Sequence, residues 1–99
     1  EISSMNQVRA YASSCVINRE VGSEMQPFIY VFGGHCKTGS TTYYLASFER
    51  YNILTNEWQH LKLSTPSGLS GAGLIFLQKT NKLLILGGSA QKDTPATMV

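Results

Sequence analysis

Charged residues are scarce in this chain, and those present do not gather in one place. Eight Lys and Arg residues against six Asp and Glu residues give a formal net charge of +2. A protein that binds nucleic acid carries a concentrated basic patch that meets the phosphates. Because no basic cluster occurs anywhere in the sequence, we expect no nucleic-acid partner.

Cysteine pairs and long hydrophobic runs are also missing. Cys15 and Cys36 lack the C-x-x-C spacing and are too few for a disulfide framework. No stretch approaches the ~18 apolar residues that a membrane helix requires, and no basic and apolar leader opens the chain. We therefore expect free thiols, a cytoplasmic location and no membrane partner. The chain begins with Glu1 rather than Met, which favours a piece of a longer polypeptide or a processed product.

Sets of catalytic or metal-binding residues are missing as well. Asp93 is the only aspartate, and no G-x-S-x-G nucleophile motif occurs, so a hydrolytic triad is not indicated. His35 and Cys36 are adjacent, but zinc needs four ligands, or three and a water. The remaining soft ligands, His60 and Cys15, fall on other predicted strands. We predict no metal, no cofactor and no catalytic residue in this chain.

Short apolar segments bounded by turn residues are what the chain does contain, and no helical i, i+3, i+4, i+7 pattern survives. A hydrophobic fraction of 42% fits a folded polypeptide. The chain is therefore predicted to be all-β. The expected strands cover residues 11–18, 28–32, 44–51, 57–63, 71–77 and 82–86, with a polar loop at 19–27 and a tight turn at 52–56.

Two parts of the sequence repeat. Residues 29–34 read IYVFGG and residues 83–88 read LLILGG, at a spacing of 54. Residues 13–17 (SSCVI) align with residues 71–75 (GAGLI) at a spacing of 58, and we expect the polar loop to absorb the difference because loops accept length changes. A period near 50 residues with four short strands is typical of a β-propeller blade.

The spacing of the glycine pairs and aromatic residues resembles the kelch repeat. An apolar strand that ends in a glycine pair is followed by a Tyr and, after six intervening residues, a Trp, and Arg9 precedes the first strand at a favoured kelch position. The matching residues are Gly33, Gly34, Tyr51, Trp58, Gly87 and Gly88. The resemblance covers about residues 5–88 and implies all-β, kelch-type blades of four antiparallel strands, lettered a to d from the inside out, in an incomplete ring.

These signature residues also have physical roles. A glycine pair lets the backbone leave a strand through positive φ without a Cβ penalty. Tyr51 and Trp58 are expected on adjacent antiparallel strands, where their rings can pack together while the hydroxyl and indole N–H bond nearby backbone.

The blade organisation leaves the propeller open. Residues 1–10 are expected to end a preceding blade, 11–66 to form a complete blade, 67–88 half of the next, and 89–99 a loop or tail. Fewer than two blades leave strand edges and an apolar face uncovered. We therefore expect the rest of the propeller, or other subunits, to close the ring.

The resemblance also implies a protein partner that meets the b–c loop, residues 35–43, and the d–a loops. The residues expected to bind it are Arg9, His35, Lys37, Thr38, Ser40 and Ser67, with Thr41 and Ser89 on the same face. We predict a non-enzymatic adaptor or scaffold of a eukaryotic cell, which recognises ubiquitin-ligase substrates or binds the cytoskeleton. The alternatives are part of an enzymatic propeller of the copper radical oxidase or sugar epimerase class, and a purely architectural component.

Overall fold

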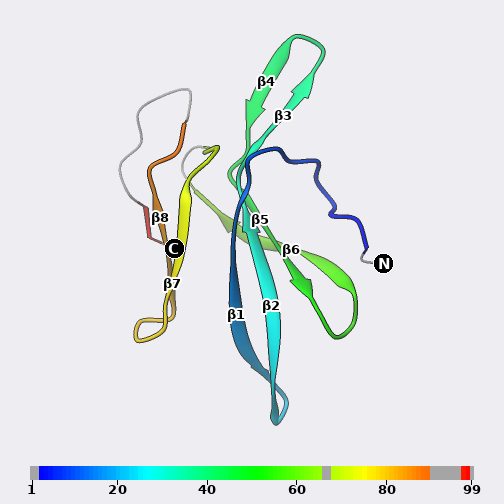
Figure 1. Ribbon diagram of the computed structural model, residues 1–99, viewed down its shortest axis with the longest axis vertical. Helices are drawn as coiled ribbons and strands as arrows, with labels where there is room; N and C mark the ends of the chain where they lie inside the picture. Colours follow the sequence, from blue (N-terminus) through cyan, green and yellow to red (C-terminus); the bar gives the residue numbers. More distant parts are fainter. Residues whose placement is uncertain (1–2, 66–67, 90–96, 99) are drawn as a thin grey trace.

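The computed structural model describes residues 3–65, 68–89 and 97–98, and these residues contain strands and no helix (Figure 1). The strands are β1 (Ser13–Val21), β2 (Glu24–Phe32), β3 (His35–Thr38), β4 (Thr41–Tyr44), β5 (Ser47–Asn52), β6 (Glu57–Ser64), β7 (Gly73–Leu77), β8 (Lys82–Leu86) and β9 (Thr97–Met98). Every pair of neighbouring strands is antiparallel, which confirms the all-β prediction. The described part of the chain thus offers no helix that is long and apolar enough to cross a membrane.

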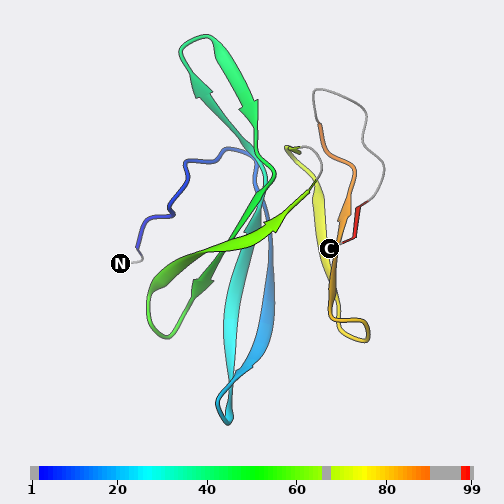
Figure 2. The ribbon, with the colours of Figure 1, turned by 180° about the vertical axis from the view of Figure 1, so that it is seen from behind.

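The first sheet has four strands in the order β1-β2-β5-β6, which are the strands expected as a, b, c and d. β3 and β4 form a separate hairpin between β2 and β5, and β7, β8 and β9 form a sheet of their own. Within the described residues these sheets do not close into a ring (Figures 1 and 2).

The turn between β5 and β6 is built by an asparagine, as the sequence predicts. The Oδ1 atom of Asn52 accepts hydrogen bonds from the backbone N–H groups of Leu54, at 2.9 Å, and Thr55, at 3.2 Å. Asn56 then takes a positive φ of 58°, which asparagine tolerates better than most residues. Short polar side chains therefore fix this turn by bonding their own backbone.

The prediction of a polar loop over residues 19–27 is wrong. β1 and β2 continue through this stretch and pair from Ser13 with Phe32 to Val21 with Glu24, leaving a two-residue turn at residues 22–23. Gly22 supplies the positive φ, 65°, that tight hairpin turns favour at their first central position. Polar residues here mark the solvent side of a long hairpin, because side chains alternate between the faces of a strand.

The two repeats differ in strand length, and the hairpin with the shorter strands has the longer turn, residues 78–81 against residues 22–23. β1 and β2 have nine residues each, whereas β7 and β8 have five. The pair Ser13 and Phe32 corresponds to the pair Gly73 and Leu86, so the first strands align at a spacing of 60 and not 58. The expected alignment is therefore out by two residues.

The expectation of a loop or tail after residue 88 is wrong for its last described part. β9 pairs with β8, with Leu84 opposite Met98 and Ile85 opposite Thr97. Without this strand the outer edge of β8 would present unpaired backbone N–H and C=O groups. β9 therefore occupies the place of a c strand in the second sheet.

The core lies between the four-stranded sheet and the β7–β8 hairpin, which stand side by side in Figures 1 and 2. Its buried members are Ile17, Phe28, Tyr30, Phe32, Phe48, Leu69, Leu83 and Ile85. Phe32 and Phe48 are both fully buried, with ring centroids 4.5 Å apart. Apolar burial across the two repeats stabilises their packing, as in any two-layer β structure.

On the opposite face of the sheet, residues 3–9 form no strand and contact β5 and β6. Tyr51 and Trp58 are paired across β5 and β6 with ring centroids 5.1 Å apart, as predicted. The indole N–H donates to the backbone oxygen of Ser3 at 2.8 Å, and the Tyr51 hydroxyl bonds the side chain of Asn56 at 2.6 Å rather than backbone. The aromatic pair therefore anchors the chain segment that precedes the sheet.

Candidate partner-binding surface

The predicted b–c loop is a β-hairpin that extends beyond the end of the four-stranded sheet (Figure 1). β3 and β4 pair from His35 with Tyr44 to Thr38 with Thr41, and the turn is closed by residues 39–40, with Gly39 at a φ of 64°. β-branched and aromatic residues favour strands, which explains why β4 forms where a loop was expected. The expected third strand accordingly begins at β5 and not at Tyr44.

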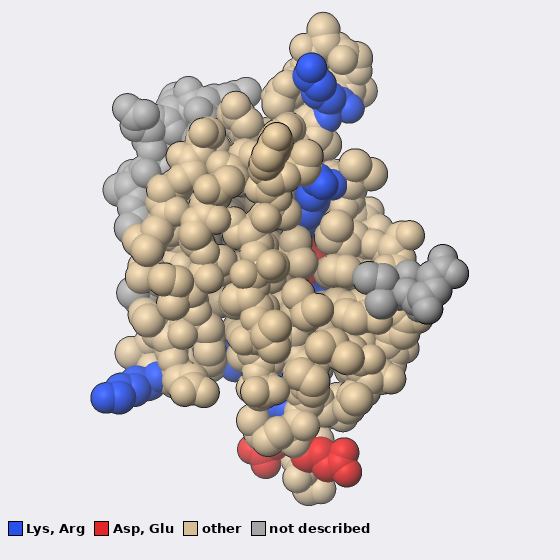
Figure 3. Space-filling model, viewed as in Figure 1, with Lys and Arg blue, Asp and Glu red and all other residues tan. Residues whose placement is uncertain are grey.

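The tip of this hairpin is polar and open to solvent. Its exposed side chains include Lys37, Thr38, Ser40 and Thr41. Figure 3 shows Lys or Arg side chains on the hairpin and Asp or Glu side chains at the far end of the molecule. The exposed acidic residues at that far end are Glu20 and Glu24, which flank the β1–β2 turn.

The base of the hairpin is an aromatic cluster around His35, which is half-buried. The His35 ring stacks on Tyr11 with centroids 5.4 Å apart and meets the edge of Tyr44 at 6.3 Å. Its Nδ1 atom lies 2.9 Å from the Ser70 hydroxyl, and its backbone pairs with Ala10. His35 therefore connects the hairpin to the segments that precede both β1 and β7.

Glycines 33 and 34 are required where the chain leaves β2. Their φ angles are 68° and 87°, and Gly87 and Gly88 repeat these values at 67° and 89°, which confirms the predicted positive φ. A Cβ atom on Gly33 would collide with the backbone oxygen of Leu69. The glycine pair thus has two roles. It adopts the positive φ angles at the end of β2, and it lets the backbones of the two repeats approach each other closely.

Tyr11 is a site residue that the sequence analysis missed. Its φ is 56°, the left-handed region that bulky residues rarely adopt, and its side chain is 75% exposed. Gly71 holds the equivalent position before β7, with a φ of 71°. Its backbone N–H donates a hydrogen bond to the backbone carbonyl oxygen of Tyr11 at 2.9 Å. Only the spacing of 60 residues, which the structure reveals, pairs this tyrosine with a glycine.

Arg9 lies beneath the surface and not on it. Its guanidinium is fully buried and forms an ion pair with Glu49 at 3.2 Å. Nε and Nη2 donate to Glu49, Nη2 also donates to the Ser47 hydroxyl, and Nη1 donates to the backbone oxygens of Gly33 and Ser47. A guanidinium has five N–H donors, and these bonds occupy all of them.

Glu49, the partner of Arg9, is fully buried on β5. Its carboxylate also accepts the backbone N–H groups of Asn6, at 2.8 Å, and Gln7, at 3.2 Å. The alternation of β5 places Glu49 on the same face as Tyr51. That shared face was the one feature of the sequence that indicated burial of Glu49. The ion pair holds the segment before β1 against the sheet, which is a structural task.

Two predicted residues, Ser67 and Ser89, belong to the second repeat. Ser67 lies outside the described residues. Ser89 is exposed and its backbone pairs with Ser70, at 2.9 and 2.7 Å, in the same way as His35 pairs with Ala10 in the first repeat. The hairpin therefore brings Lys37, Thr38, Ser40 and Thr41 together. His35 lies at its base, and Arg9 lies buried beside the end of β2.

The histidine and cysteine side chains of the described residues do not form a cluster that could bind a metal ion. His35 and Cys36 are on β3, Cys15 is on β1 and His60 is on β6. Over residues 3–65, 68–89 and 97–98 no three His, Cys, Asp or Glu side chains are placed to hold a metal ion. Both cysteines are free thiols, and burial raises the pKa of the Cys15 thiol above its ordinary value.

The comparison with known families agrees with this geometry. The family model of the kelch motif matches residues 29–62, which run from β2 through the β3–β4 hairpin and β5 into β6. No curated protein matches the chain. The matched segment includes the first glycine pair and the packed Tyr51 and Trp58, so the chain contains a kelch motif within a partial, blade-like antiparallel sheet.

Proposed function

We propose that this chain is part of a kelch-type β-propeller that binds a partner protein through the β3–β4 hairpin and the aromatic cluster at its base. The role is that of a non-enzymatic adaptor or scaffold, with ubiquitin-ligase substrates or the cytoskeleton as the two kinds of client. The two free thiols are consistent with the reducing cytoplasm of a eukaryotic cell.

The observation that carries this proposal is the exposed Tyr11 ring, held in place by a strained backbone and by His35. A bulky residue at positive φ costs free energy, and such strain is found mainly at functional sites. A second tyrosine, Tyr43 on β4, has a side chain that is 51% exposed. Exposed tyrosines beside polar side chains are typical of the centre of a protein–protein interface.

Arg9 and the hairpin residues contribute to this surface in different ways. Lys37, Thr38 and Ser40 are exposed and can contact a partner directly. Arg9 supports the surface from below, because its donors are occupied within the chain. In this proposal His35 orients Tyr11 and contacts the partner only at its exposed edge.

Photo-crosslinking tests the proposal with a matched pair of positions. Ser40 and Ser23 each follow a positive-φ glycine in a two-residue hairpin turn, at the two far ends of the molecule. A photoreactive residue at Ser40 should yield a discrete protein adduct in cell extract that the same residue at Ser23 does not yield. The adduct should weaken when Lys37→Glu is added, and identical adducts from the two positions would contradict the proposal.

A further inference from the structure

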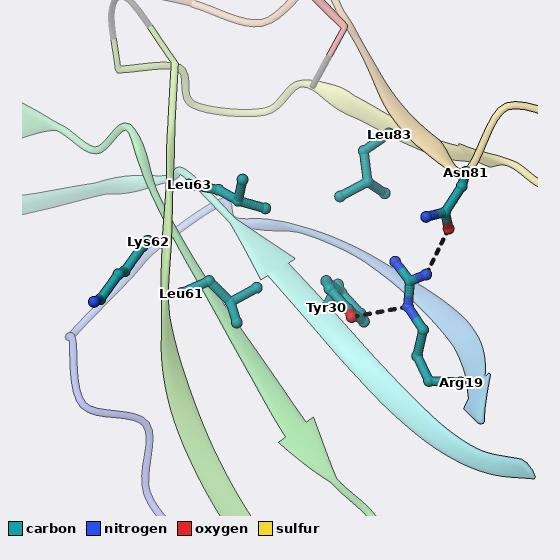
Figure 4. Close-up of a pocket in the computed structure, with 7 residues that line it drawn as sticks. All are labelled: Arg19, Tyr30, Leu61, Lys62, Leu63, Asn81 and Leu83. Carbon is teal, nitrogen blue, oxygen red and sulfur yellow. Dashed lines mark hydrogen bonds between the residues drawn. The ribbon is translucent and has the colours of Figure 1, made fainter. Parts of the chain in front are cut away.

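An apolar hollow of about 300 Å³ lies between β6 and the β7–β8 hairpin (Figure 4), and none of the residues that line it belongs to β3 or β4. Leu61, Leu63 and Leu83 line its sides. Figure 4 shows Tyr30 and Arg19 together at one end, with the Arg19 side chain bonded to both the Tyr30 hydroxyl and Asn81.

The Tyr30 hydroxyl is the centre of this end of the hollow. Arg19 donates to it through Nε at 3.2 Å, and Arg50 donates through Nη1 at 3.1 Å. A guanidinium can only donate, so the phenol oxygen must accept both bonds, and its own proton needs an acceptor. Tyr30 is only 3% exposed, and none of the described residues accepts that proton.

Both guanidinium groups are held by uncharged neighbours. Arg50 lies over the Phe28 ring at 4.4 Å and donates through Nε to Gln59 at 2.8 Å. Arg19 lies over the Phe76 ring at 5.2 Å. These contacts fix the direction of each cation while leaving the Nη2 donors of both unused in the described structure.

The two cations also lack an anion. In the part of the chain that the structure describes, the one ion pair is that of Arg9 with Glu49. Glu57 shares with Arg50 the lining of a neighbouring hollow of about 260 Å³, yet it forms no ion pair with it. The guanidinium groups of Arg19 and Arg50 repel each other where they meet at the Tyr30 hydroxyl. A negatively charged group placed between them would stabilise both cations.

We propose that Arg19, Tyr30 and Arg50 bind the carboxylate of an Asp or Glu side chain from an extended, partly apolar partner segment. The carboxylate accepts bonds from both guanidinium groups and from the Tyr30 hydroxyl. Side chains two positions away on an extended segment point to the same face, about 7 Å along, and so enter the hollow beside the leucines. This interface uses none of the hairpin residues, so it stands or fails independently of the proposed function.

Two capped peptides test the proposal on the unmodified chain. Acetyl-Leu-Thr-Glu-Thr-Leu-amide places one carboxylate between two leucines on one face of a strand, and the same peptide with Gln is its uncharged match. Titrations followed by the NMR signals of the arginine Nε–H groups give both dissociation constants. We expect the Glu peptide to bind at least about tenfold more tightly, as charge-assisted hydrogen bonds exceed neutral ones.

Variants locate the effect. Arg19→Gln with Arg50→Gln should remove the preference for Glu, and Tyr30→Phe should reduce it while preserving the ring. Lys37→Gln, which removes one positive charge from the distant hairpin, should leave it unchanged. Equal affinity for the two peptides, or a response to inorganic phosphate without one to the Glu peptide, would overturn the proposal even if the arginine variants failed to fold.

Discussion

Glu49 and Arg9 are 40 residues apart in sequence and form a fully buried ion pair. From the sequence, the arginine was assigned to a partner and the glutamate was given no role. Neither residue carries a local signal for the other, because pairing over such a distance depends on how the segment before β1 crosses the sheet. The geometry shows that one interaction explains both residues.

Replacing Glu49 with Gln should destabilise the chain strongly. The substitution preserves size but leaves the Arg9 charge buried without its counter-ion, a defect that costs about 3–5 kcal/mol. Urea unfolding followed by tryptophan fluorescence measures the change, since Trp58 is the only tryptophan. Glu57→Gln, at an exposed position of β6, is the control and should change stability by less than about 0.5 kcal/mol. A small effect at Glu49 would show that the pair contributes little.

Cys15 gives the stability a pH dependence of known sign. Burial raises its pKa in the folded chain above the ordinary value of 9.0, so folding favours the protonated thiol. Its contribution is fully present below pH 9.0 and is lost as the pH rises through the raised value. Compared with a Cys15→Ala variant, the unmodified chain should therefore lose more stability between neutral pH and strongly alkaline pH. Parallel pH dependences in urea unfolding would contradict this assignment.

Among the strands, the sequence predicted which segments pair but not how far they extend. β8 was predicted with its observed bounds because glycine and polar turn residues flank a continuous apolar run. β1 was predicted to begin and end too early, at residues 11 and 18 instead of 13 and 21, and β2 was predicted to begin too late, at residue 28 instead of 24. The polar residues near their shared turn resemble a loop when only one face of a long hairpin is buried. The β3–β4 hairpin was missed for the same reason, and Tyr11 was missed because its strain is a property of backbone geometry.

The glycine pair that ends β2 offers a matched test at this scale. Gly33 and Gly87 have φ angles of 68° and 67°, but a Cβ atom at Gly33 would collide with Leu69 whereas one at Gly87 would meet no described atom within 4 Å. Gly87→Ala should cost about 1 kcal/mol for its backbone conformation. Gly33→Ala should cost several times more, measured as the midpoint of urea unfolding. Equal effects would mean that conformation alone explains these glycines.

The molecule as a whole exposes surface that a finished propeller would cover. Val16 on β1 is 62% exposed and Ile75 on β7 is 47% exposed, and both belong to strands at the edge of a sheet. Apolar side chains beside unpaired backbone groups promote association with other strands.

We therefore expect the chain alone to associate as its concentration rises. Sedimentation velocity should show species larger than the 10.9 kDa monomer at about micromolar or higher concentration. Val16→Lys combined with Ile75→Lys should reduce these species, since charge on an edge strand opposes pairing. A monomer at all concentrations would show that the exposed edges are already protected.

The unequal hairpins of the two repeats have a consequence for how such proteins diverge. β1 and β2 are longer than β7 and β8 at their outer turn, while both hairpins start from the same glycine-ended junction. When residues are added to both strands at the turn end of a hairpin, the side chains nearer the glycine-ended junction keep facing the same way. The hairpin can therefore lengthen at its turn without changing how the junction packs against the neighbouring repeat. Changes near the β1–β2 turn therefore leave the contact between Gly33 and Leu69, which joins the two repeats, as it is.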